Sequence, residues 1–127
     1  MYLTGNTEFV LKLSHGDNII DKLKEFAQNN NIIQGYFISG SGLIKDFEIS
    51  GFKGPGKIEN TALKIPYQII AVSGKIFKKG NSFYPEMKVS LTRSGTNSIN
   101  GLLLKGTVEE EMEIMIRLID YKKMIIS

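Results

Sequence analysis

The sequence predicts an α+β fold, in which a mostly antiparallel β-sheet is packed by one main amphipathic helix. Two observations support this prediction. Apolar residues recur at helical spacing only over residues 18–28, whereas much of the remaining chain alternates apolar and polar residues between short turn signals. One helix cannot supply the crossovers of a parallel sheet, so most connections must be antiparallel.

The helix is expected over residues 18–28. Asp17 or Asn18 suits the N-cap, because a short side chain with an oxygen atom accepts a hydrogen bond from the first turn. Three asparagines at residues 29–31 should end the helix, since asparagine tolerates the left-handed conformation. The apolar residues of this segment share one stripe: Ile19, Ile20, Leu23, Phe26 and Ala27.

Alternation predicts strands at residues 8–14, 36–39, 43–52, 58–64 and 67–77, followed by a hairpin over residues 83–106 with its turn at residues 94–97. Residues 78–81 should form the turn that leads into this hairpin. In the tail, residues 112–119 alternate with a period of two, which favours a strand, although glutamate and methionine favour a helix. We predict a strand. The acidic run at residues 109–111 should lie on a turn before it, as a solvated gatekeeper.

The Gly-Ser-Gly sequence at residues 40–42 is expected to interrupt two strands. Backbone N–H groups in such a segment can cradle an anion, but phosphate loops lead into a helix and this one leads into a strand. A structural bend or bulge is therefore the favoured interpretation.

Composition excludes several classes of function. The 127 residues predict a single domain, residues 1–127, and no apolar run approaches the roughly 20 residues of a membrane span. The first residues lack the pattern of an export signal, so a cytoplasmic protein is expected. The absence of cysteine excludes disulfides and thiolate sites, and His15 is the only imidazole. We predict no catalytic residue, no metal and no cofactor, and an exposed or capping role for His15.

The net charge of +3 comes from 14 lysines and 2 arginines against 13 acids. Lys75, Lys78 and Lys79, with Lys53 and Lys57, are candidate contacts to DNA phosphates. The alternative is that they are solvated lysines that protect strand edges from aggregation. Because arginine supplies the bidentate contact that reads guanine, any DNA contact here should be non-specific.

Several segments, in their order and spacing, resemble the prokaryotic form of the plant-and-prokaryote conserved (PPC) domain. They are the strand and Gly-Asp-Asn-Ile opening at residues 10–19, the glycine-rich step at residues 39–43, residues 68–74, and the hairpin. The resemblance covers about residues 8–118. It implies a sheet with one packed helix, a homotrimer, and a role in assembly or partner binding, with DNA or another protein as partner. Apolar residues at 69–70 and 102–104, which a single helix cannot all cover, independently favour a homo-oligomer.

The hairpin departs from the family pattern. Family members often carry His-x-His-x-x-Leu and Gly-Gly-His-Leu on these strands, but residues 86–91 read Glu-Met-Lys-Val-Ser-Leu and residues 100–103 read Asn-Gly-Leu-Leu. Lys88 and Leu102 do not ligate zinc, and Glu86 alone is short of the ligand number. The leading hypothesis is therefore a non-enzymatic binding module. The alternative is a small-ligand or enzymatic site between subunits near Glu86, Lys88 and Leu102, where Glu86 and Lys88 share one strand face. An exposed ion pair between Glu86 and Lys88 is the simpler interpretation.

Overall fold

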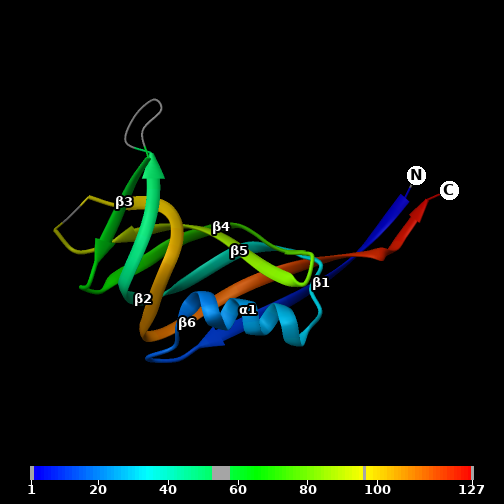
Figure 1. Cartoon of the computed structure of the whole chain (residues 1–127), viewed down its shortest axis with the longest axis horizontal. Coiled ribbons are helices and arrows are strands. Elements are labelled where there is room, and N and C mark those ends of the chain that lie inside the picture. The colour runs from blue at the N-terminus through cyan, green and yellow to red at the C-terminus, as the bar shows by residue number, and fades with distance from the viewer. Residues whose placement is uncertain (1, 53–57, 96, 127) are drawn as a thin grey trace.

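A computed structural model describes residues 2–52, 58–95 and 97–126 (Figure 1). These residues form a mostly antiparallel sheet and one helix, as the sequence predicts. The strand pairings are all antiparallel. In chain order the elements are β1 (Tyr2–Leu13), α1 (Ile19–Asn29), β2 (Gln34–Phe52), β3 (Ile58–Leu63), β4 (Tyr67–Lys79), β5 (Ser82–Thr92) and β6 (Ile99–Ile126).

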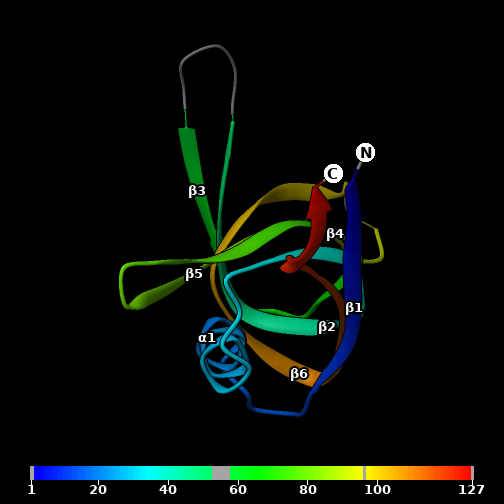
Figure 2. The same ribbon diagram turned by 90° about the vertical axis from the view of Figure 1, so that its right-hand side faces the viewer.

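The sheet closes on itself through its two longest strands. Its strand order is β1-β6-β5-β4-β2-β3, and β6 also pairs with β2, so that β2, β4, β5 and β6 form a ring. Register shifts in the β2–β6 pairing bend both strands, which allows each strand to pair with three others along its length. Figure 2 shows the β2–β3 and β4–β5 hairpins projecting from this ring, while the ends of β1 and β6 run side by side.

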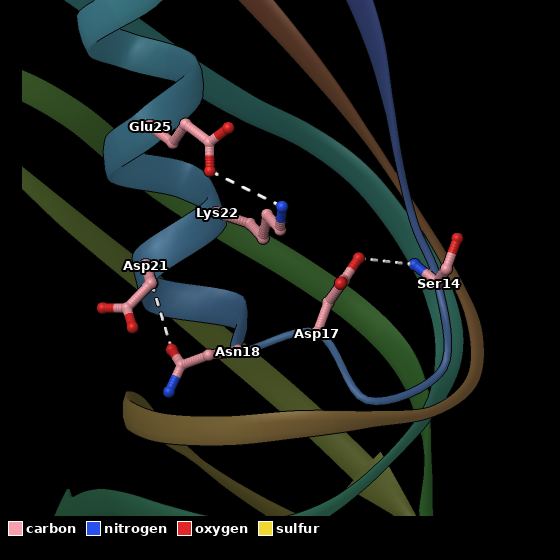
Figure 3. Close-up of polar contacts among 6 residues, drawn as sticks. All are labelled: Ser14, Asp17, Asn18, Asp21, Lys22 and Glu25. Atoms are coloured by element: carbon pink, nitrogen blue, oxygen red, sulfur yellow. Dashed lines mark hydrogen bonds and ion pairs between the residues drawn. The ribbon is translucent and has the colours of Figure 1, made fainter.

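The helix α1 begins where the sequence predicts, and its cap is now assigned. The Asn18 side chain accepts a hydrogen bond of 3.0 Å from the backbone N–H of Asp21, whereas Asp17 accepts one of 2.8 Å from the N–H of Ser14 (Figure 3). Asn18 is therefore the N-cap and Asp17 closes the preceding turn. At the other end, Asn31 adopts a φ of 47°, as expected of the asparagine run.

One side of α1 joins the core, and its neighbours in the fold are β5 and β6. Ile19, Leu23 and Ala27 are fully buried. Phe26 makes an edge-to-face contact with Phe9 of β1 at a centroid distance of 5.4 Å. No helix among the described residues combines the length and the apolar character that a membrane span requires.

The glycine-rich step lies inside β2, so the predicted interruption into two strands is wrong. The bulge prediction is confirmed, because the register shifts on both sides of this step. Gly42 has a φ of +145°, and a Cβ there would lie 2.7 Å from the carbonyl oxygen of Glu111 on β6. Glycine therefore lets β2 remain paired while it bends.

The strand predicted for the tail is confirmed, but it is continuous with the return strand of the hairpin. Both belong to β6. The predicted turn at residues 109–111 is wrong, because Val108 is fully buried and pairs with Ile44, and pairing with β2 resumes beyond the acidic run. The predicted turn at 78–81 is shorter, since β4 continues through Lys79. In the turn at 94–97, Gly95 has a φ of +81°, and Thr96 lies outside the described residues.

The apolar residues at 69–70 and 102–104 do not all lie on one face, because successive side chains of a strand point to opposite sides. Ile69 and Leu103 are buried, whereas Ile70 is 54% exposed and Leu104 is 40% exposed. The large side chains that fill the core are Ile44, Phe47, Ile76, Met87, Leu91, Met112, Ile114 and Ile116, together with the residues of α1.

Candidate functional site: the outward face of the β4–β5 hairpin

The β4–β5 hairpin has one face in the core and one face toward solvent. Ile76, Met87 and Val89 point inward and are buried. The opposite side, here called the outward face, consists of five cross-strand pairs from tip to base: Lys79–Ser82, Phe77–Tyr84, Lys75–Glu86, Ser73–Lys88 and Ala71–Ser90. The period of two along each strand therefore places every site residue predicted on β4 and β5, except Lys78, on one surface.

The base of the outward face forms part of a hollow of about 800 Å³. Glu86 and Lys88 line it from β5, and Leu102 lines it from β6, where it pairs directly with Lys88. The three residues of the predicted pocket are thus neighbours. The rest of the lining is partly polar, with Ser50, Ser73, Ser90 and Asn100, and partly small or apolar, with Gly51, Ala71, Val72, Val89 and Gly101.

The chemistry of this hollow does not suit a metal ion. Lys88 presents an ammonium group and Leu102 presents a hydrocarbon side chain, so neither is a zinc ligand under ordinary conditions. Within the described residues, no three histidine, cysteine, aspartate or glutamate side chains come close enough together to hold a metal. Glu86 lies opposite Lys75 and Lys88 lies opposite Ser73 in the strand register, and in the described part of the chain no ion pair joins Glu86 to Lys88.

The tip of the outward face is basic and aromatic. The Phe77 and Tyr84 rings are stacked, with centroids 5.6 Å apart and planes inclined by 26°. Lys75 Nζ lies 5.3 Å from the centroid of Phe77. On the other side of the hairpin, Lys78 Nζ lies 5.7 Å from the centroid of Phe83.

The three predicted lysines are therefore close neighbours at one tip. Lys75, Lys78 and Lys79 are all exposed. Lys53 and Lys57, the other two members of the predicted patch, lie outside the described residues. The aromatic stack between the lysines was not foreseen. The signal was present in the sequence, because Phe77 and Tyr84 each lie three residues from the two-residue turn at Gly80 and Asn81 and therefore pair across the hairpin.

A second polar cluster joins the β1–α1 loop, β2 and β6. Glu109 Oε2 lies 2.8 Å from Lys45 Nζ, and the exposed His15 ring contacts the backbone carbonyl of Glu109 through Nδ1. The hydrogen bond to Lys45 lowers the pKa of Glu109, although desolvation opposes the shift. The same bond raises the pKa of Lys45. This cluster fixes the β1–α1 loop to β6, and sequence reasoning missed it because residues 15 and 109 are far apart in the chain.

The fold defines a class of small domain: a bent antiparallel sheet with a closed ring, one packed helix and a projecting hairpin. The sequence profile of the Plants and Prokaryotes Conserved (PCC) domain matches residues 2–120. The chain belongs to this family, which confirms the resemblance drawn from its motifs.

Solved structures share the fold at low sequence identity. A plant- and prokaryote-conserved (PPC) protein from Pyrococcus horikoshii superposes with a TM-score of 0.81 at 22% identity, covering 97% of this chain and 85% of the other. A metal-containing protein from Archaeoglobus fulgidus gives 0.79 at 20% identity, covering 94% and 84%. A "putative DNA binding protein" from Bacteroides thetaiotaomicron gives 0.77 at 18% identity, covering 93% and 84%. The sequence matches none of the curated proteins with which it was compared.

Proposed function

We propose that this chain is a homotrimeric, cytoplasmic binding and assembly module that associates with DNA and has no catalytic role. The observation that carries the proposal is the tip of the β4–β5 hairpin, which presents Lys75, Lys78 and Lys79 together on a projecting element (Figure 2). Lysine side chains attract phosphate groups without reading bases. The solved relative from Bacteroides thetaiotaomicron, which is named for DNA binding, also supports an association with DNA.

Apolar side chains on the outside of the sheet support assembly. Val10 of β1 is 50% exposed and pairs with Met115 of β6, which in turn pairs with Ser39 beside the 40% exposed Ile38 of β2. These residues make an apolar row across three adjacent strands. A second copy of the chain would remove this row from water, which agrees with the trimer implied by the family resemblance.

The test is a titration of the full chain against labelled duplex DNA that carries a single-stranded extension, at ~50 mM and ~200 mM salt. Three phosphate contacts per hairpin predict roughly 20- to 40-fold weaker binding at the higher salt. Replacing Lys75, Lys78 and Lys79 by glutamine should remove most of that salt dependence. The matched control replaces Lys22 and Lys24 of α1, both distant from the hairpin in sequence. Absence of binding at ~50 mM salt would reject the DNA association.

The hollow at the base of the outward face favours a second candidate function, the binding of a small polar ligand between subunits. Its lining brings a carboxylate, an ammonium group and several hydroxyl groups around one space of about 800 Å³. Inorganic phosphate and a set of free amino acids are suitable probes. One of them should raise the melting temperature of the wild type but not that of Lys88→Met. Failure of every probe would leave the DNA-associated module as the remaining proposal.

A further inference from the structure

We propose that the tip of the β4–β5 hairpin binds single-stranded nucleic acid, with a base stacked on the Tyr84 ring and the adjoining phosphates held by Lys75 and Lys79 on the same face and by Lys78 on the opposite face. The inference rests on the proposed association with DNA and narrows it to the unpaired form of the strand. Five features of the described residues carry it: a supported aromatic ring, neighbouring lysines, adjoining stretches of chain without acid, a third strand beside the hairpin, and arginines that are already engaged.

Tyr84 is a supported stacking surface. Its ring is stacked on Phe77 of the neighbouring strand, at 5.6 Å between centroids, and the residue remains 45% exposed. A ring held by a second ring loses little freedom when a ligand packs against it. Every unpaired base offers a flat face for such stacking, whereas the bases of a duplex are already covered by their neighbours. The ring therefore suits a single strand better than a duplex.

Lys75 and Lys79 flank this ring on the outward face, and the hairpin tip is built from stretches of chain that contain no acid. Residues 75–85 include no aspartate or glutamate, and neither do residues 26–45. The second segment adjoins the tip, because the N–H of Lys78 donates to the carbonyl of Ile33 at 3.0 Å. Glu86 comes only after this region, one pair further toward the base. On the side toward the turn, a phosphate beside Tyr84 would meet positive charge, whereas Glu86, opposite Lys75, bounds the site on the other side.

The platform is three strands wide at this level. Gln34 of β2 pairs with Phe77, and Tyr36 pairs with Lys75, so both β2 residues adjoin the outward face of the hairpin. Their side chains are joined by a hydrogen bond of 2.7 Å from Gln34 Nε2 to the Tyr36 hydroxyl. A row of aromatic and amide groups beside lysines matches the alternation of bases and phosphates along a single strand.

Both arginines of the chain are engaged elsewhere. Arg117 binds the Glu8 carboxylate through Nε and Nη2, at 3.0 and 2.7 Å. Arg93 donates to the carbonyl of Pro66 at 2.9 Å. Arginine is the residue that most often reads guanine in the major groove of a duplex. The tip therefore contacts phosphates and stacks on bases, and we expect no strong sequence preference.

The experiment compares three labelled probes, namely oligothymidylate, oligouridylate and a DNA duplex of the same length, by fluorescence anisotropy with the full chain. At ~50 mM salt the wild type should bind both single strands more tightly than the duplex. Tyr84→Ala should weaken single-strand binding about tenfold, because one stacking contact is lost, and should leave duplex binding unchanged. Ile70→Ala, which truncates another exposed apolar side chain of the same hairpin, is the control and should bind like the wild type.

Two further variants keep the result decisive if Tyr84→Ala fails to fold. Tyr84→Phe retains the ring and should bind single strands like the wild type. Exchange of Lys78 and Lys79 for glutamine should reduce the slope of log affinity against log salt by about 1.4 on single strands. Lys24→Gln, which removes one charge from α1, should leave the slope unchanged.

The possible failures separate the inference from the proposal on which it depends. Duplex binding at least as tight as single-strand binding, with no effect of Tyr84→Ala on either, would overturn the inference and leave the DNA association intact. No binding of any probe at ~50 mM salt would overturn both. Binding of oligothymidylate without oligouridylate would restrict the occupant to single-stranded DNA, and the reverse result would restrict it to RNA, with the DNA association rejected.

Discussion

Gly74 allows β4 and β5 to approach closely in the middle of their hairpin, and its replacement by alanine should destabilise the protein strongly. Gly74 pairs with Met87 and has a φ of +109°. A Cβ at this position would overlap with the backbone carbonyl oxygen of Glu86. Because the obstructing atom belongs to the backbone, no side-chain rotation can relieve the overlap. The strands would have to separate between Glu86 and Lys88, at the edge of the hollow.

The expected loss follows from two costs. A non-glycine residue in this backbone region costs about 1–3 kcal/mol, and a forced shift of packed atoms costs about 1–3 kcal/mol more. We take the sum as about 4 kcal/mol. With an unfolding entropy of roughly 2.1 cal/mol/K for each residue, this corresponds to a fall of about 15 °C in melting temperature for the full chain.

Gly80→Ala is the matched control, because it makes the same substitution in the same hairpin. Gly80 also has a positive φ, +63°, but a Cβ there would have no atom within 4 Å. It should cost about 1 kcal/mol, or about 4 °C. Both variants should be melted by circular dichroism at one protein concentration, since assembly would make the melting temperature depend on concentration. Equal shifts for the two variants would refute the argument that the contact with β5 determines the loss.

Two more predictions concern the core and the polar cluster at Glu109. Leu23→Ala on α1 should lower the free energy of unfolding by about 2–5 kcal/mol in urea titrations, because Leu23 is fully buried. Lys24→Ala, at the exposed neighbouring residue, should change it by less than about 0.5 kcal/mol. Similar losses for the two variants would contradict the assigned burial. Glu109→Gln should destabilise the protein at pH 7. The folded-state pKa of Glu109 is lowered, so its stabilising contribution is present above the ordinary value of 4.5 and is lost as the pH falls through the folded value. The difference in melting temperature between wild type and variant should therefore shrink at pH 3, while Glu110→Gln, an exposed neighbour, should show little difference at either pH. The pKa of Lys45 is raised above 10.5, so its contribution persists to alkaline pH.

Features encoded within a few residues could be predicted from the sequence. The helix α1 follows from a cap, an apolar stripe and an asparagine run, all of which are local. Alternation in β4 and β5 was enough to place Glu86 and Lys88 on one face, and pairing with β6 then brings Leu102 beside Lys88. The family resemblance rested on the order of such local motifs, which explains why it was confirmed across most of the chain.

Features that depend on long-range pairing could not be predicted. The Gly-Ser-Gly step reads as a break, but pairing of β2 with β4 and β6 keeps the strand continuous around Gly42. The acidic run reads as a turn, yet neighbouring residues of β6 pair with β2, and Glu109 meets Lys45 there. Nothing near either residue in sequence indicates its partner, because the contact is created only when the ring closes.

The measurement that tests the account most directly is the mass of the full chain in solution, determined by light scattering after size exclusion across a range of concentrations. The account treats this domain as an assembled module whose apolar row at Val10, Met115 and Ile38 is covered by other copies of the chain. It predicts a mass of three times the 14.2 kDa of one chain. A mass of 14.2 kDa at every concentration would contradict it.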